Sequence, residues 1–206
     1  MNYQDYFCER DPLAFPQWQK AVVGIAGAGG LGSNAAILLA RAGIGKLIIA
    51  DFDIVSVSNL NRQAFNLDQI GEPKVEALAA NIRRVNPFIQ LEIHCCRLNP
   101  ENIPGIYAQA EVMIEAFDKA LQKQMLIETW LSHYPGKPLI CASGLAGFGR
   151  SDEIRIEHQN GLFIVGDQSS ELQEGISPIA PRVMIVAAMQ ANLCLEIISK
   201  AQKDNT

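Results

Sequence analysis

The sequence lacks several features that would assign its 206 residues to a specialised class of protein. It has no block of basic residues, and its formal net charge of -5 argues against nucleic-acid binding, which usually needs a strongly basic surface. Its apolar runs are interrupted by Gly, Arg or Gln before they reach the roughly 20 residues that span a membrane, and residues 1–10 lack the apolar core of a signal peptide. We therefore expect a cytoplasmic protein that binds neither nucleic acid nor membrane.

The sequence also lacks a CxxC pair. Scattered cysteines in a cytosolic protein indicate reduced thiols, most of them buried. Apolar residues make up 49% of the chain and charged residues 19%, an ordinary globular composition, and the length fits one domain with a single sizeable core. The cysteines are Cys8, Cys95, Cys96, Cys141 and Cys194.

Predicted strands and helices alternate over most of the chain. An apolar run ending in glycine (21–27), a segment with helical spacing of its apolar residues (29–43) and a second apolar run (46–51) predict the opening of a parallel α/β sheet. Further helices are predicted over Pro73–Val85, Asn99–Gln109 and 118–134, and further strands over 89–94, 111–117 and Lys137–Ala142.

The pattern changes after residue 150. Segments 152–158 and 161–166 predict an antiparallel pair of strands, a helix of about twenty residues starts near Pro178, and Asp167–Ser177 is the segment we expect to be most mobile. We predict one domain over residues 1–206, on a Rossmann-like sheet that is parallel in its first half and mixed in its second, with helices on both faces. Its parts are an N-terminal arm (1–18), a nucleotide-binding part (19–150) and the antiparallel strands with the C-terminal helix (151–206).

A glycine-rich turn follows the first predicted strand. Gly27, Gly29 and Gly32 satisfy GxGxxG, and Gly30 lies within it. Because the turn opens a helix, its backbone amides should face a phosphate group. Asp51, at the end of the second strand, can accept hydrogen bonds from ribose hydroxyls. These features suit NAD and ATP equally, and such a turn can also pack a helix on a strand without any ligand.

The polar loop from Asp51 to Gln63 distinguishes the two nucleotides, because a dehydrogenase does not need it. Asn59 and Arg62 are three residues apart, so one helical turn would bring both to the crevice, where a guanidinium suits a triphosphate. Lys74, in the first turn of the next helix, adds a second cation, and such cations stabilise the charge that builds on a leaving pyrophosphate. Each of these residues alone is more often a solvated surface group.

Two carboxylates are candidates for holding Mg²⁺. Asp118 ends an apolar run at the carboxyl edge of a predicted strand, where open α/β sheets place their ligand crevice. A carboxylate there could hold Mg²⁺ against phosphates, and Asp53 is a second candidate. The plain alternative for Asp118 is that it caps the helix that follows.

These residues resemble the ThiF/MoeB/HesA adenylyltransferases, bacterial relatives of ubiquitin-activating enzymes. The matching segments run in the family's order over residues 20–150, and the tail resembles a shorter ThiF variant. The segments are GAGGLGS (Gly27–Ser33), DFDIVSVSNLNRQ (Asp51–Gln63), GEPKVEA (Gly71–Ala77), VNP (Val85–Pro87) and AFDK (Ala116–Lys119), which stands where the family has TDN.

The resemblance implies a role for each candidate residue. Gly30 would lie against the nucleotide, Asp51 would bind the ribose and Asp118 would position Mg²⁺. The phosphates would be contacted by Asn59, Arg62 and Lys74. In the family an N-terminal arginine reaches the active site of a dimer mate, and Arg10 is the candidate here. The catalytic set would then be Arg10, Arg62, Lys74 and Asp118, in a homodimer.

Two departures from the family narrow the expected chemistry. Many relatives bind a structural zinc ion with two CxxC pairs, and this chain has none, so we expect no zinc. Relatives also place a sulfur-relay cysteine in a region where this chain has no cysteine, between Cys141 and Cys194. Adenylation itself needs no thiol, because a carboxylate attacks the α-phosphorus and pyrophosphate leaves.

The function implied by the resemblance is ATP-dependent adenylation of the C-terminal carboxylate of a small ubiquitin-like sulfur carrier, a ThiS-like protein of thiamine biosynthesis. Carriers of molybdopterin synthesis or of peptide modification are alternatives. An NAD-dependent oxidoreductase would share the glycine turn, but His94, His133 and His158 are scattered and form no evident proton relay. A scaffold without activity would not need the whole phosphate-binding set.

Overall fold

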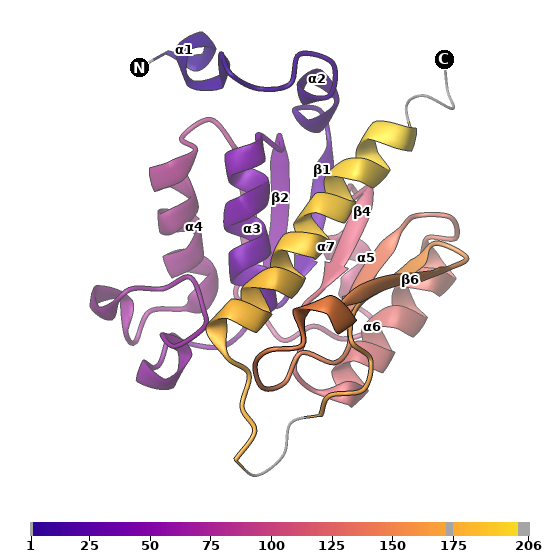
Figure 1. The fold of residues 1–206 in the computed structure, drawn as a ribbon. Coiled ribbons are helices and arrows are strands. Elements are labelled where there is room, and N and C mark those ends of the chain that lie inside the picture. Colours follow the sequence, from indigo (N-terminus) through magenta and orange to yellow (C-terminus); the bar gives the residue numbers. More distant parts are fainter. Residues whose placement is uncertain (1, 172–174, 202–206) are drawn as a thin grey trace.

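The computed structural model describes residues 2–171 and 175–201, which form one seven-stranded sheet with helices on both faces (Figure 1). The strand order is β3-β2-β1-β4-β5-β7-β6, and every neighbouring pair is parallel except β6 with β7, which is antiparallel. The predicted Rossmann-like sheet, parallel first and mixed at its C-terminal end, is thus confirmed. The strands are β1 (Val22–Ala26), β2 (Lys46–Ala50), β3 (Gln90–His94), β4 (Val112–Glu115), β5 (Leu139–Ala142), β6 (Arg155–Gln159) and β7 (Leu162–Gly166).

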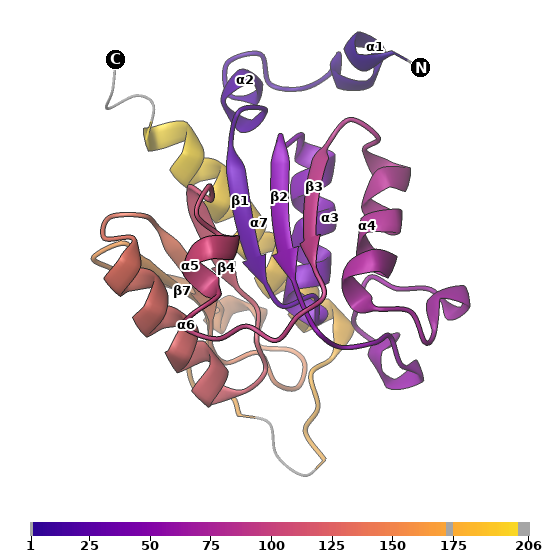
Figure 2. The ribbon, with the colours of Figure 1, turned by 180° about the vertical axis from the view of Figure 1, so that it is seen from behind.

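Helices cover both faces of this sheet. Figure 1 shows α3 (Gly30–Ala42), α4 (Lys74–Val85) and α7 (Ala180–Ala201) in front of it, and Figure 2 shows α5 (Ile103–Ile106) and α6 (Ala120–His133) on the opposite face. Each face has its own cluster of buried apolar side chains. Strands β4 and β5 are buried throughout, which is why, apart from Glu115 at the end of β4, they appear in the sequence as apolar runs rather than alternating ones.

Three helix starts differ from the prediction. Pro73 is the N-cap of α4 rather than its first helical residue. Lys119 is the N-cap of α6 and no side chain caps that helix, so the interpretation of Asp118 as a cap is wrong. The helix predicted from Asn99 is confined to α5, because the Asn99 side chain accepts the backbone N–H groups of residues 101 and 102 and so forms a turn instead.

The C-terminal helix α7 has the length predicted for it, and by length and composition alone it could also cross a membrane, which the interrupted apolar runs did not suggest. In the fold it packs along α3 and contributes Val186, Leu193 and Cys194 to the core. We therefore interpret it as a core helix that covers one face of the sheet. The expected mobile segment before it, Asp167–Ser177, includes residues 172–174, which lie outside the described residues.

The N-terminal arm lies at the amino ends of the strands. It contains α1 (Tyr3–Phe7) and α2 (Phe15–Trp18), joined by contact between the Phe7 and Phe15 rings at a centroid distance of 4.7 Å. The indole of Trp18 donates to Ser199 Oγ near the end of α7 at 3.0 Å. The carboxyl ends of the strands, at the opposite edge of the sheet, are therefore not covered by this arm (Figure 1).

Candidate functional site

A cavity of about 690 Å³ lies at the carboxyl ends of β1, β2, β4 and β5. This is the edge at which open α/β sheets bind ligands. Most of the residues predicted for the site line this cavity, although they come from segments far apart in the sequence. They are Gly27, Gly29, Gly30, Asp51, Asp53, Arg62, Lys74 and Asp118, whereas Gly32, Asn59 and Arg10 do not line it.

The four glycines of the turn lie in different structural surroundings. Gly27 has φ +100°, a conformation that favours glycine. A Cβ on Gly32 would lie 1.9 Å from the carbonyl oxygen of Gly27, so this glycine lets α3 pack against the turn. A Cβ on Gly29 would meet only Gln63 Nε2, at 4.0 Å, which leaves open space on the cavity side. Gly30 starts α3, and its Cβ would lie 3.1 Å from Val183.

Asp51 connects the glycine turn to the polar loop. One carboxylate oxygen accepts the backbone N–H of Ala28 at 2.6 Å, and the other accepts that of Asp53 at 2.8 Å. Each carboxylate oxygen has two acceptor positions, so both can still accept a hydrogen bond from a ligand hydroxyl. The side chain is thus fixed in place at the cavity wall with accepting capacity to spare.

The two predicted cations reach the cavity by different routes. Lys74 has a side chain only 7% exposed, and its Nζ lies 2.9 Å from the carboxylate of Asp53. An ammonium has three protons, so two remain for a ligand. Arg62 donates through Nη1 to the carbonyl oxygen of Ser58 at 3.2 Å and to the side chain of Asn61 at 2.8 Å. Both positive charges therefore belong to side chains that line the cavity.

Asn59 does not share the cavity with Arg62, contrary to the prediction from their spacing. Its side-chain oxygen accepts the N–H of Ser56 at 3.0 Å and closes a capping box around the short helix η1 (Val57–Asn59). Because the turn is a 3₁₀ helix with this local hydrogen bond, the side-chain amide of Asn59 binds within its own loop. Asn59 stabilises the loop that presents Arg62.

Asp118 lies in the loop between β4 and α6, directly after Phe117, whose backbone is bound by one member of an ion pair. The carboxylate of Glu115, fully buried, accepts the backbone N–H of Phe117 at 2.6 Å and both oxygens lie within 3.0 Å of Lys123 Nζ. Lys123 also donates to the carbonyl oxygen of Ala142 at 3.2 Å. Asp118 itself makes no hydrogen bond or ion pair with any described residue, so its carboxylate is available at the cavity.

Glu115 and Lys123 are site residues that the sequence did not single out, although both line the cavity. Burial raises the pKa of Glu115, and the nearby Lys123 ammonium opposes that rise without cancelling it. The three protons of Lys123 have three acceptors on β4 and β5. The ammonium therefore holds the ends of these strands together instead of pointing at a ligand.

Gln63 is a further residue of the cavity wall to which the sequence assigned no role. It is 9% exposed, and its amide oxygen is buried without a hydrogen-bond partner among the described residues. A buried, unpaired amide costs stability unless a ligand or water satisfies it. A signal was present in the sequence, because Gln63 closes the polar loop directly after Arg62.

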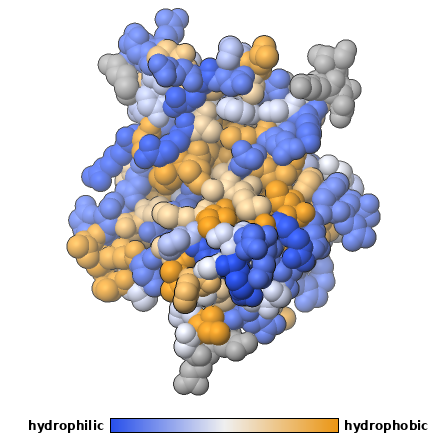
Figure 3. All heavy atoms as spheres, in the orientation of Figure 1, coloured by the Kyte–Doolittle hydropathy of each residue, from blue (hydrophilic) through white to orange (hydrophobic). Residues whose placement is uncertain are grey.

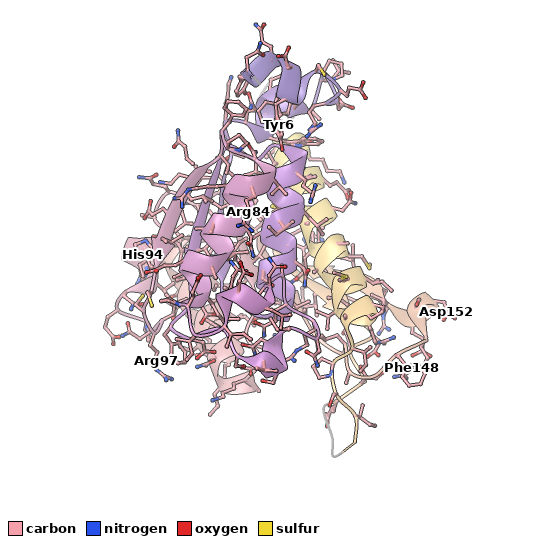
Figure 4. All side chains as sticks on the ribbon, turned by 90° about the vertical axis from the view of Figure 1, so that its left-hand side faces the viewer. Tyr6, Arg84, His94, Arg97, Phe148 and Asp152 are labelled. Carbon is pink, nitrogen blue, oxygen red and sulfur yellow. The ribbon has the colours of Figure 1, made fainter. Side chains whose placement is uncertain are left out.

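Arg10 lies far from the cavity of its own chain. Its guanidinium is 5.5 Å from the ring centroid of Tyr6 and 5.7 Å from that of Phe7. Figure 4 shows Tyr6 at one end of the molecule and Arg97, which lines the cavity, at the other. Any contact of Arg10 with such a cavity would have to be made in a second copy of the chain.

The thiols are divided between surface and interior. Cys141 and Cys194 are buried as expected, whereas Cys8 and Cys95 are exposed and Cys96 is intermediate, because they lie in the arm and in the segment after β3. Burial raises the pKa of the Cys141 thiol, next to Glu115 in the cavity wall, which makes it a poor nucleophile. Within residues 2–171 and 175–201, no group of three or more His, Cys, Asp or Glu side chains could hold a metal ion.

Comparison with known proteins agrees with this fold. Adenylyltransferase and sulfurtransferase UBA4 of Candida glabrata is 32% identical over 87% of this chain, and the SAMP-activating enzyme E1 of Haloferax volcanii is 35% identical over 56% of it. The chain spans 43% of the length of each of these two relatives. The tRNA N6-threonylcarbamoyladenosine dehydratase TcdA of E. coli, solved in complex with ATP, has the same fold, with a TM-score of 0.88, 21% identity and coverage of 99% of this chain and 96% of that one. Residues 11–206 match the ThiF family, and the chain therefore belongs to that family.

Proposed function

We propose that this ThiF-family protein is an adenylyltransferase that uses ATP to activate a carboxylate. The observation that carries the proposal is the convergence of Gly29, Asp51, Arg62, Lys74 and Asp118 on one cavity at the carboxyl edge of the sheet. The names of its relatives, which include adenylyltransferases and an activating enzyme, support the same reaction.

The residues of the cavity fit a nucleotide triphosphate. The open space at Gly29 and the N-terminus of α3 suit a phosphate group, because backbone amides and the helix dipole both favour an anion there. Asp51 would accept the ribose hydroxyls. Arg62 and Lys74 would neutralise the phosphates, with Lys74 using the protons that Asp53 leaves free.

The reaction is a displacement at the α-phosphorus. A carboxylate oxygen of the substrate forms a bond to that phosphorus, the bond to the bridging oxygen of the β-phosphate breaks, and that oxygen leaves with pyrophosphate. Arg62 and Lys74 stabilise the charge that develops on the leaving group, and the rigid glycine turn orients the phosphates. No proton transfer and no thiol is needed.

We assign a Mg²⁺ site to Asp118, because its carboxylate is free of partners among the described residues and faces the cavity. Asp53 is less suited, since Lys74 already pairs with it. When bound, Mg²⁺ would add positive charge at the phosphates, and one or two carboxylates commonly suffice for an ion shared with phosphate.

A second cavity, of about 490 Å³, suits the end of a protein substrate. It shares Ala146 and Ser170 with the nucleotide cavity. Phe148, 82% exposed, lines it and lies at the same end of the molecule as Arg97 (Figure 4). Small side chains at the junction and an apolar mouth would admit a narrow chain end and hold the folded body of a carrier outside. We propose a small ubiquitin-like sulfur carrier in the cytoplasm, ThiS of thiamine biosynthesis first, with molybdopterin or peptide-modification carriers as alternatives.

A homodimer would give Arg10 access to a cavity. Leu38 of α3 and Met184 of α7 are 37% and 51% exposed, and Figure 3 shows apolar residues gathered over the face where these two helices run. Apolar surface of this kind marks protein interfaces. We propose that two copies pair in solution and that Arg10 of one reaches the cavity of the other. Sedimentation of the purified protein as a monomer at micromolar concentration would exclude this arrangement.

Exchange of labelled pyrophosphate into ATP tests the adenylation. We expect exchange that requires Mg²⁺ and a carrier, measured with ThiS and with a molybdopterin-type carrier in parallel. Arg62→Ala and Asp118→Ala should suppress exchange while circular dichroism shows a folded protein, and Arg83→Ala, a charge on the far end of α4 that does not line the cavity, is the control. Calorimetric titration with Mg-ATP and with NAD separates this function from a dehydrogenase, and preference for NAD would reject it.

A further inference from the structure

An ion pair that is buried on both sides lies beyond the nucleotide cavity. Asp167 directly follows β7, and Arg182 lies in the first turn of α7; they are 3% and 2% exposed. Arg182 Nη2 donates to the carboxylate of Asp167. Further hydrogen bonds reduce the cost of burying a charge pair, and the remaining contacts of this pair show which segments it holds.

The contacts of Arg182 reach the segment after β5. Its Nη1 donates to the carbonyl oxygen of Gly149 and, at 3.2 Å, to that of Arg150. A planar guanidinium with several fixed donors can bridge two backbone carbonyls and a carboxylate at once, which an ammonium cannot do in the same geometry. Arg182 thus ties α7 to residues 149–150 and to Asp167.

The contacts of Asp167 organise the turn after β7. Its Oδ1 accepts the backbone N–H groups of Ser169 at 2.8 Å and Ser170 at 2.7 Å. Burial raises the pKa of this carboxyl, but the hydrogen bonds from Ser170, Ser169 and Arg182 outweigh that effect and hold the pKa well below its usual range. Asp167 is therefore ionised at neutral pH.

The two segments held by the pair meet at the junction of the two cavities. The backbone N–H of Ala146 donates to Ser170 Oγ at 3.1 Å, and both residues line both cavities. Nearby, a Cβ on Gly144 would lie 2.1 Å from Asp167 Oδ1, so the two segments are in close contact. The width of the junction is therefore set by how residues 144–150 and 167–171 are held together.

We propose that Asp167 and Arg182 are positioning residues for the substrate carboxylate, because they fix the passage from the second cavity to the nucleotide. The inference rests on the proposed function. Neither residue lines either cavity, so the pair acts through Ala146 and Ser170. Loosening it widens or closes the passage and weakens productive binding of the carrier end, while the glycine turn, Asp51 and Lys74 keep their contacts to the nucleotide.

The test uses two variants. Ser170→Ala removes one hydrogen-bond acceptor at the junction and leaves no buried charge unpaired, and Arg182→Lys keeps the positive charge but loses the planar guanidinium with its several donors. Loss of one neutral hydrogen bond predicts a rise of about threefold to tenfold in KM for ThiS in pyrophosphate exchange for Ser170→Ala, and a larger rise for Arg182→Lys. Because Ser170 also lines the nucleotide cavity, KM for ATP can change in Ser170→Ala, but it should rise less than KM for ThiS. Ser151→Ala, an exposed serine outside both cavities, is the matched control and should leave both constants unchanged.

Hydrogen–deuterium exchange adds a measurement that needs no carrier. Amides of residues 144–150 and 169–171 should exchange faster in Arg182→Lys than in the wild type, while those of residues 23–26 in β1 should not. If the amides of residues 144–150 and 169–171 exchange as fast in the wild type as in Arg182→Lys, the proposal is wrong. An unchanged KM for ThiS in both Ser170→Ala and Arg182→Lys also overturns it. If the wild type shows no carrier-dependent pyrophosphate exchange, the proposed function fails, and the amide exchange still decides whether the pair holds the junction.

Discussion

Two glycines of the same turn should respond in opposite ways to one added methyl group. In Gly29→Ala the methyl enters the open side of the turn, where only Gln63 Nε2 lies within 4.0 Å, and the backbone has φ −79°, which alanine adopts without strain. In Gly32→Ala the methyl would lie 1.9 Å from the carbonyl oxygen of Gly27 and 3.1 Å from the Cβ of Ala116. The first variant tests the space for a ligand, and the second tests packing.

The magnitudes follow from these surroundings. Replacing glycine with alanine where the backbone allows it stabilises a protein by about 0.4–1 kcal/mol through the unfolded state, but Gly29 is the N-cap of α3, where alanine is less favourable than glycine. These two effects oppose each other, so Gly29→Ala should unfold within about 4 °C of the wild type. A methyl forced into a close-packed contact costs about 1–3 kcal/mol. If phosphate approaches the chain at Gly29, its binding should weaken by that amount, which is about 5- to 150-fold in Kd for ATP. In Gly32→Ala the same cost falls on folding, because a backbone carbonyl cannot rotate away.

Two measurements on each variant separate these effects. Thermal unfolding without nucleotide should place Gly29→Ala close to the wild type and Gly32→Ala clearly below it. Calorimetric titration with Mg-ATP should then show that Gly29→Ala, the more stable of the two variants, binds ATP more weakly than the wild type. If Gly29→Ala binds ATP as the wild type does, the phosphates do not lie at this turn and the assignment of the site is wrong. If Gly32→Ala unfolds at the wild-type temperature, the close contact with Gly27 is not a constraint.

Three further substitutions test the charges around the cavity. Lys74→Met should weaken ATP binding by about 1.5–3 kcal/mol, the size of a charge-assisted hydrogen bond, with little loss of stability because Asp53 is 49% exposed; unchanged calorimetric affinity would contradict its role. Lys123→Met leaves Glu115 buried and unpaired and should lower the free energy of unfolding in urea by about 3–5 kcal/mol. The double variant Lys123→Met/Glu115→Leu should lose less stability, and equal losses in the two variants would refute the pairing. Asp167→Asn should be less stable than the wild type at pH 7. Because the pKa of Asp167 in the folded protein lies below the unfolded value of about 3.9, the difference in unfolding free energy between variant and wild type should shrink as pH falls below that value. A difference that does not depend on pH would show that the carboxylate charge is not involved.

Local sequence was sufficient to predict the half of the fold that holds the nucleotide-binding elements. An apolar run, the turn at Gly27 and a helical pattern specify β1, the glycine turn and α3 without knowledge of distant contacts. The order of the elements then places Asp51 and Asp118 at one edge, because parallel strands end on the same side of the sheet. The convergence of these side chains on one cavity is therefore a consequence of topology.

Features that depend on the partners of individual side chains could not be predicted from the sequence. Periodicity placed Asn59 beside Arg62 on one helical turn, but the hydrogen bond to Ser56 directs the amide into its own loop. Similarly, the spacing of Glu115 and Lys123 suggests no contact, because a loop and a helix start separate them. Such pairs become visible only when the ends of two strands and a helix are in place together.

Two ion pairs, each with a buried carboxylate, explain how a polar cavity can be held in place at the edge of an apolar sheet. Glu115 with Lys123 joins the ends of β4 and β5 below the loop of Asp118, and Asp167 with Arg182 joins the segments after β5 and β7 to α7. Loops at a ligand edge have few apolar contacts of their own, so backbone carbonyls and amides bound to a fixed charge replace that packing. A buried ion pair adds little net stability over a packed apolar pair. Its contribution here is geometric, because one charged group can satisfy several backbone groups from different segments at once, and removing either charge should therefore disturb the cavity as well as the fold.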